Sequence, residues 1–359
     1  MHGAMAHLWQ PRAPPPLMNQ STDFTLVSYC VTRHLARSER AAMAKRCLAA
    51  VCFALRLLRP SLVVMGIDPT FPPPARRTLQ KSATIVLIRK SLLDPMPPAL
   101  HRRLYDRKCG LEVAGDASRA EAAAASRIHL YGFDRFLVLQ KAYAMKPAAQ
   151  PVLWLDPDAL AVSIAAARPP RSLGACEIAG TNRRNACAAA ACEKAWGQQP
   201  CEPDAPRPTL AGMRSSGAFN NDGVAWLPTS PHLVDAMVAR LFAGNFSFYR
   251  TFPPGARTTF KDQDLFAYHL THTPGCAFVD LGPCAFWRAK GKRRCREGAP
   301  LMIHTTWWFK AIGVIERAVG SLAAGSCASL PPRLSSEEVE QLCTHSPADQ
   351  SEICRRIAH

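Results

Sequence analysis

Hydrophobic residues in the first half of the chain form short runs separated by helical patterns, which predicts an alternating α/β fold. The continuous apolar runs Phe24–Cys30, Ser61–Ile67 and Ala83–Ile88 are typical of strands buried in a parallel sheet. Ser38–Leu58 has an apolar face over basic positions and predicts a helix that Pro60 ends. Strand, helix and strand in this order predict parallel pairing through right-handed crossovers.

The later segments continue this alternation and lead to a second set of predicted elements. Part of Glu121–Met145 is predicted to be helical, with its aromatic residues in the core, and Pro147 ends it. The remaining predicted elements are strands at Pro151–Leu155 and Val224–Leu227, helices at Pro231–Phe242 and near Phe260–Leu270, and a strand that ends near His304. We expect a disordered tail at 1–20, one domain at 21–320 with a loop-rich insertion at 165–210, and a peripheral tail with short helices at 321–359.

The strand at Pro151–Leu155 leads directly into two aspartates, Asp156 and Asp158, which Pro157 separates. Because proline cannot donate to a sheet ladder, the strand is predicted to stop there and to leave both carboxylates at its C-terminal edge. Open α/β sheets bind their ligands at that edge, and paired carboxylates suit Mg²⁺ or Mn²⁺. Asp-Pro-Asp is equally good turn chemistry, so an ordinary turn is the competing interpretation.

A second polar stretch precedes the predicted strand at Val224–Leu227. Asn220, Asn221, Asp222 and Gly223 follow one another there. A polar, glycine-containing bend before a buried strand allows amide side chains and backbone to reach a ligand. An ordinary β-turn is the alternative.

Two further segments contain candidate site residues near the ends of predicted elements. Asp262, Gln263 and Asp264 stand at a helix start, where capping is as good an explanation as an active-site role. His304 follows an apolar pair at a strand end, which makes it a candidate third metal ligand, although single histidines are more often structural. Lys310, six residues further on, is a candidate partner for a diphosphate.

Composition narrows the class of protein without identifying it. The chain has 359 residues, 48% hydrophobic and 20% charged, which is typical of a globular protein, and a formal charge of +17 that favours anionic partners. No zinc-finger or RNA-binding motif occurs, so a nucleic-acid-binding protein is the least favoured interpretation. The apolar stretch Cys47–Leu55 is too short to span a membrane, and no signal peptide or membrane anchor is recognisable, which is also compatible with a truncated N-terminus.

The sequence contains 14 cysteines without a zinc-binding pattern. Together with sequons at Asn19 and Asn245, they indicate disulfides in a lumenal or secreted compartment. Free buried thiols are the alternative.

The motifs VLWLDPD, FNNDGVAWLPTS, KDQDLF and IHTTWWFK, in this order, resemble those of GT-A nucleotide-diphospho-sugar transferases, most closely families 77, 8 and 34. The resemblance spans residues 24–315 and implies a Rossmann-like, mixed and mainly parallel sheet flanked by helices. It also implies a metal-dependent glycosyltransferase, a hexosyl- or pentosyltransferase, that retains configuration, and a lumenal Golgi location. Pro157 departs from the small residue that is more usual inside the acidic motif.

The resemblance also assigns roles to residues of this chain. It implies Mn²⁺ or Mg²⁺ as cofactor, a UDP-sugar as donor and a glycan or protein as acceptor. The implied metal ligands are Asp156, Asp158 and His304; Asp262 and Gln263 are implied to contact the sugar; and Asn221 and Gly223, with Asn220 and Asp222 beside them, are implied to line the donor or acceptor pocket. From the residues themselves we add Lys310 as a substrate-binding residue at the diphosphate, and Asp222, Asp262 or Asp264 as a ligand of sugar hydroxyls or a general base. A catalytically inactive relative that binds glycans or nucleotide sugars is the alternative.

Overall fold

The computed structural model describes residues 23–92, 131–180, 224–245, 262–280, 286–288 and 302–304, with short gaps in the first two ranges, together with Cys327 and Ser335. The helices in these ranges are α1 (Arg37–Leu58), α2 (Pro73–Gln80), α5 (Arg135–Met145), α8 (His232–Phe242) and α9 (Asp262–His272). The strands are β1 (Thr25–Cys30), β2 (Leu62–Ile67), β3 (Thr84–Leu87), β4 (Val152–Leu155), β5 (Ala159–Ala161), β6 (Glu177–Gly180), β7 (Val224–Leu227), β8 (Ala277–Asp280), β9 (Phe286–Arg288) and β10 (Met302–His304).

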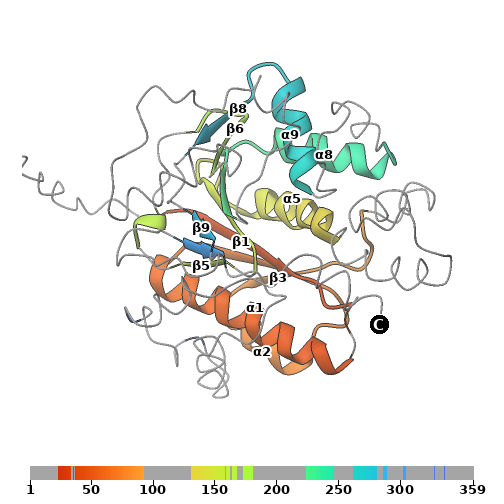
Figure 1. Cartoon of the computed structure of the whole chain (residues 1–359), viewed down its shortest axis with the longest axis vertical. Coiled ribbons are helices and arrows are strands. Elements are labelled where there is room, and N and C mark those ends of the chain that lie inside the picture. Colours follow the sequence, from red (N-terminus) through yellow and green to blue (C-terminus); the bar gives the residue numbers. More distant parts are fainter. Residues whose placement is uncertain are drawn as a thin grey trace, which may run out of the picture.

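Seven strands form a central sheet in the order β3-β2-β1-β4-β7-β6-β8 (Figure 1). The first four are mutually parallel, β7 is antiparallel to both β4 and β6, and β8 is parallel to β6. The predicted fold class, a mixed and mainly parallel sheet flanked by helices, is confirmed. The predicted parallel pairing of the first three strands is confirmed as well.

Helices cover both faces of the sheet, with α1 and α2 on one side and α5, α8 and α9 on the other (Figure 1). Side chains of a strand point alternately to the two faces, so each strand supplies both cores. In β4, Leu153 and Leu155 belong to the core with α1, whereas Val152 and Trp154 belong to the core with α5. This double burial explains why these strands are continuous apolar runs rather than alternating patterns.

A smaller sheet lies beside the central one, and its first strand, β5, follows β4 in the chain. It has the order β5-β10-β9, in which β10 is antiparallel to β5 and parallel to β9. The strand β5 contacts α1, so the two sheets share the core on that side.

Several elements were not predicted. No helix was predicted after β2, where several prolines follow one another, but Pro73 and Pro74 form the first turn of α2, where a missing N–H costs nothing. The short strands β6, β8 and β9 were also missed, and β6 lies within the segment predicted to be loop-rich. The predicted tails at 1–20 and 321–359 lie outside the described residues apart from Cys327 and Ser335.

Within the ranges that the structure describes, no helix is both long and apolar enough to cross a membrane.

Candidate active site

The chain reverses its direction across the sheet at β1. It moves from β1 outward to β2 and β3, and β4 then forms on the other side of β1. The helices α1 and α5 belong to the cores on opposite faces. In open α/β sheets such a reversal leaves a crevice beyond the carboxyl ends of the two diverging strands, and ligands bind there. We call the region beyond the ends of β1 (Cys30) and β4 (Leu155) the switch-point crevice.

Asp156, the residue that follows β4, is held at this crevice by two donors. Its side chain is 14% exposed, and its Oδ1 lies 3.0 Å from a guanidinium nitrogen of Arg135. Trp154 donates from Nε1 to the same oxygen at 2.8 Å. Two donors on one carboxylate oxygen, one of them charged, fix the orientation of the side chain.

Arg135 begins α5, and its buried guanidinium lies against two neighbouring aromatic rings, whose centres are 5.4 Å apart. Its side chain is 4% exposed, and its Cζ lies 4.5 Å from the centre of the Trp154 ring and 5.2 Å from that of Tyr29. Its Nε donates to the Gly132 carbonyl oxygen at 3.1 Å. A buried cation is costly unless it is paired, and here the carboxylate of Asp156 and the ring faces offset that cost. A fixed positive charge therefore lies beside the carboxylate.

A second ion pair lies beside the first, at the start of α5. Asp134 is fully buried and accepts hydrogen bonds from Ser91 Oγ and from the Leu92 backbone N–H, each at 2.8 Å. An Arg33 guanidinium nitrogen lies 3.6 Å from Asp134 Oδ2 and donates to the Ile88 carbonyl oxygen at 3.2 Å. The loops after β1 and β3 are thereby joined to α5.

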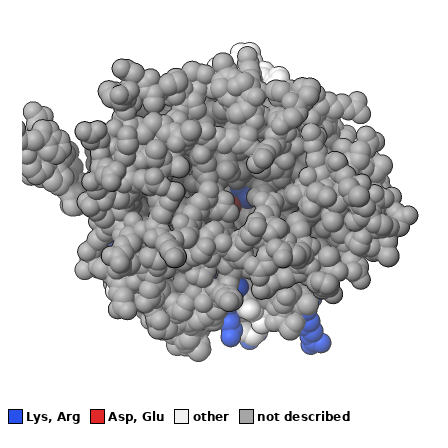
Figure 2. Space-filling view, in the orientation of Figure 1, with Lys and Arg blue, Asp and Glu red and all other residues white. Residues whose placement is uncertain are grey.

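Described acidic and basic atoms also meet at the surface. Figure 2 shows them side by side near the centre of one face of the molecule.

A hydrogen-bonded turn joins Asp156 to Ala159. The Ala159 backbone N–H donates to the Asp156 carbonyl oxygen at 3.0 Å, and β5 begins at Ala159. In the pairing of β5 with β10, Ala159 is opposite His304. The backbone of the proposed third ligand therefore lies across from the residue that follows Asp158. The side chains of Asp158 and His304 lie outside the described part of the structure, and so their role as ligands stays a prediction.

The other predicted site residues are placed only in part. Val224, the first residue of β7, pairs with Leu155, so β7 begins at the same sheet edge as Asp156. The candidates Asn220, Asn221, Asp222 and Gly223 immediately precede Val224 in the sequence and, like Lys310, lie outside the described residues. Asp262, Gln263 and Asp264 form the first turn of α9, as predicted, but their side chains are not described.

Sequence reasoning missed Arg135, Asp134 and Arg33. The signal was present in the segment FDRFLVL, where an aspartate and an arginine interrupt a run of core residues. Charged side chains are rarely fully buried unless they are paired. An arginine at the start of a core-facing helix therefore predicts a buried carboxylate nearby.

The described cysteines are all paired, which confirms the disulfide interpretation for them. Three bonds join Cys30 to Cys47, Cys52 to Cys327 and Cys176 to Cys276. Helix α1 contains two of these cysteines. It is therefore tied both to the end of β1 and to Cys327 near the C-terminus.

Comparisons with known proteins return matches in structure only. No family model matches the sequence, and no curated protein matches it. Mouse xyloside xylosyltransferase 1 is similar at a TM-score of 0.40 and 15% identity, over 80% of this chain and 99% of that one. The galactosyltransferase LgtC, crystallised with donor and acceptor sugar analogues, is similar at a TM-score of 0.40 and 9% identity, over 93% and 95% of the two chains. An active-site mutant of LgtC gives a TM-score of 0.42 at 9% identity, over 89% of this chain and 100% of that one.

These neighbours belong to the class that the sequence motifs resemble, the glycosyltransferases.

Proposed function

We propose that the switch-point crevice binds a nucleoside-diphosphate sugar and that the protein transfers the sugar to an acceptor hydroxyl. The observation that supports this most directly is the Arg135–Asp156 pair, in which a buried cation and a fixed carboxylate meet beyond β4. A diphosphate needs both positive side chains and a divalent cation to neutralise its charge. The crevice offers a positive side chain, Arg135, and a ligand for the divalent cation, Asp156.

The residues near the crevice suit a divalent cation, Mn²⁺ or Mg²⁺. Asp156 is oriented by Arg135 and Trp154, and the strand register brings the backbone of His304 next to the Asp156–Ala159 turn. We assign the metal to Asp156, Asp158 and His304, a set of carboxylate and imidazole donors that Mn²⁺ accepts. When bound, the metal neutralises negative charge that develops on the leaving diphosphate.

The remaining residues act on the substrate. The guanidinium of Arg135 is fixed before the ligand arrives, so it stabilises developing charge without reorganisation. Lys310 adds a second positive charge at the diphosphate. Asp222, Asp262 or Asp264 binds sugar hydroxyls or acts as general base. Gln263 contacts the sugar, and Asn220, Asn221 and Gly223 line the donor or acceptor site.

The proposed donor is a UDP-sugar, and the proposed acceptor is a glycan or a glycoprotein. The three disulfides support an oxidising compartment such as the Golgi lumen, because cytosolic thiols are kept reduced.

The decisive experiment is thermal melting of the full chain with a panel of nucleotide sugars, with and without Mn²⁺, followed by an assay of sugar transfer or donor hydrolysis. A ligand that binds only the folded state raises the melting temperature. We expect a UDP-sugar to raise it only when Mn²⁺ is present and to be turned over. The variant Asp156→Asn should lose both effects.

The same measurement separates the alternative function. A catalytically inactive nucleotide-sugar-binding protein would be stabilised by the donor but would not hydrolyse or transfer it. If none of the nucleotide sugars raises the melting temperature, the proposed function is wrong.

A further inference from the structure

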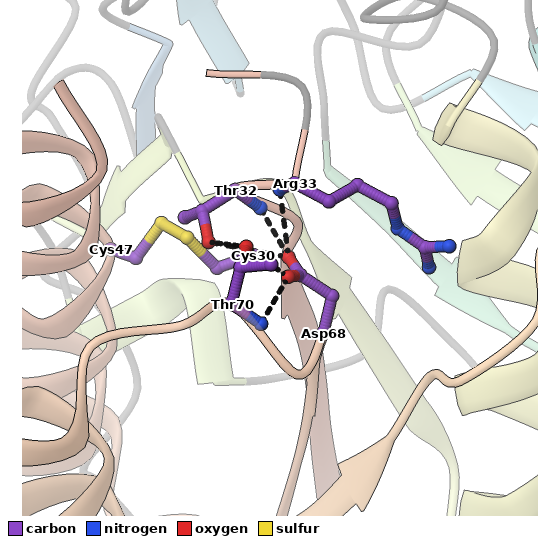
Figure 3. Close-up of a disulfide and its surroundings, with 6 residues drawn as sticks. All are labelled: Cys30, Thr32, Arg33, Cys47, Asp68 and Thr70. Atoms are coloured by element: carbon purple, nitrogen blue, oxygen red, sulfur yellow. Dashed lines mark hydrogen bonds between the residues drawn. A yellow bond between two sulfur atoms is a disulfide. The ribbon is translucent and has the colours of Figure 1, made fainter. Parts of the chain in front are cut away.

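The loop after β1 is held by a carboxylate that lies beneath it. Asp68, which follows β2, is only 1% exposed. It accepts hydrogen bonds from the backbone N–H groups of Thr32 and Arg33 and from both the N–H and the hydroxyl of Thr70, the last two at 2.8 Å and 2.5 Å (Figure 3). One buried side chain therefore fixes the backbone at the ends of two neighbouring strands.

A covalent bond holds the same loop at its start. Cys30, the last residue of β1, is joined to Cys47 of α1, and Thr32 follows two residues later (Figure 3). The segment of residues 31–33 thus leaves a strand end that is cross-linked to α1, and it is then bonded to Asp68. Such a loop has few alternative conformations.

This loop supports the charged groups of the crevice. Its last residue, Arg33, reaches Asp134 and the Ile88 carbonyl oxygen. Asp134 is followed by Arg135, which pairs with Asp156. Polar contacts, together with the peptide bond between Asp134 and Arg135, therefore link the end of β2 through the loop after β1 and the start of α5 to the end of β4.

We propose that Asp68 is a positioning residue for nucleotide-diphosphate binding, acting by holding residues 31–33 in the shape that the crevice requires. This inference rests on the proposed function. Asp68 is too deeply buried to meet a ligand, so its effect passes through the loop. A loop that is already ordered in its bound conformation loses little conformational entropy on binding, so the ligand binds more tightly.

The test is the dissociation constant of UDP with Mn²⁺, measured by calorimetry on the full chain, for Asp68→Asn and Thr70→Val. Asp68→Asn places an amide NH₂ among N–H donors, and Thr70→Val removes one donor at nearly constant volume. We expect the dissociation constant to rise roughly tenfold for the first and severalfold for the second. In a transfer assay the donor KM should rise more than kcat falls.

Thr78→Val is the matched control, because the Thr78 hydroxyl donates to the Pro74 carbonyl oxygen within α2, away from the loop. It should leave the dissociation constant unchanged. If Asp68→Asn does not fold, the dissociation constants of Thr70→Val and Thr78→Val are compared instead, and a weaker affinity in Thr70→Val alone supports the positioning role. Wild-type affinity in folded Asp68→Asn or in Thr70→Val overturns the positioning role. A wild-type protein that binds no nucleotide overturns the proposed function as well.

Discussion

At the scale of single residues, the Arg135–Asp156 pair sets the energetics of the crevice. The arginine is the more deeply buried partner, with 4% of its side chain exposed against 14% for the aspartate. Removing one member of a buried pair leaves an uncompensated charge, whereas removing both does not. The pair therefore contributes to specificity and site geometry more than to net stability.

This asymmetry predicts the result of a double-mutant cycle. Asp156→Asn, which leaves the arginine charge buried, should lower the free energy of unfolding by about 2–3 kcal/mol. Arg135→Gln should cost less, and the double variant should be more stable than Asp156→Asn alone. Urea unfolding of the four proteins gives the coupling. Single-variant effects that add to within about 0.5 kcal/mol would show that the two groups do not interact.

The indole of Trp154 has a separate effect on the same carboxylate. Trp154→Phe keeps a ring beneath Arg135 but removes the Nε1 donor, so Asp156 loses one of its two orienting bonds. We expect UDP and Mn²⁺ to bind roughly threefold to tenfold more weakly in calorimetry. Trp226→Phe is the control, because Trp226 is a buried core residue that packs on Phe24. It should lower the melting temperature without changing the affinity.

At the scale of elements, the position of α5 depends on a glycine in β2. A Cβ at Gly66 would overlap Val138 Cγ2 of α5 and come within 3.2 Å of Ile88 Cδ1. Gly66→Ala should therefore displace the helix that begins with Arg135, at a cost of about 1–3 kcal/mol in unfolding free energy. Adding Val138→Ala should recover part of this loss, as measured by urea unfolding. Equal stability of Gly66→Ala and wild type would contradict the close packing.

The packing of α9 predicts a dependence of stability on pH. Burial, together with the charges of Arg240 and His272, lowers the pKa of His269 from 6.5 to about 4. Between these values the unfolded chain binds a proton that the folded chain does not, so stability is lost as the pH falls from 6.5 towards 4.

His269→Gln should remove this contribution. As the pH is lowered from 7 to 4.5, the unfolding free energy of wild type should fall by on the order of 2 kcal/mol more than that of the variant. His232→Gln, at the exposed start of α8, is the matched control for the substitution itself. An identical pH dependence in His269→Gln would exclude the assignment.

Elements were predictable from the sequence where burial produces either an uninterrupted apolar run, in a strand, or a helical period. Strands such as β1 and β4 are apolar on both faces, and α8 places its apolar residues on one side, so pattern alone located them. The helix α2 was missed because its prolines are favourable only at a helix start, a position that composition does not reveal. The strands β6, β8 and β9 are about as short as β4, but each contains a charged residue (Glu177, Asp280 and Arg288), so none of them forms an uninterrupted apolar run.

At the scale of the whole molecule, the candidate site was predictable only for residues that stand at strand ends. Asp156 follows an apolar strand and could be found in that way. Asp68 could not, because the loop residues that it holds, Thr32 and Arg33, lie 36 and 35 residues away in the sequence. Arg135 interrupts a run of core residues and so signals a buried charge, but its partner Asp156, 21 residues away, could not be identified from the sequence. The strand order that brings β1 and β4 together emerges only from the folded chain.

The disulfides connect the whole molecule, and their effects on stability and on ligand binding should rank in opposite orders. Their sequence separations are 275 residues for Cys52–Cys327, 100 for Cys176–Cys276 and 17 for Cys30–Cys47. A cross-link restricts the unfolded chain more when it closes a longer loop, from about 3 kcal/mol for 15 residues to nearly 5 kcal/mol for 100. Paired cysteine-to-alanine variants should therefore lose least stability at Cys30–Cys47.

Binding should respond in the other direction. Removing Cys30–Cys47 frees the start of the loop that Asp68 holds, so it should weaken UDP binding severalfold, as measured by calorimetry at a temperature where every variant is folded. Removing Cys176–Cys276, which joins the residues just before β6 and β8 at the far end of the sheet, should lower the melting temperature and leave that affinity unchanged. If affinity instead falls in step with stability in both variants, the loop after β1 has no special role and the whole fold sets the geometry of the crevice.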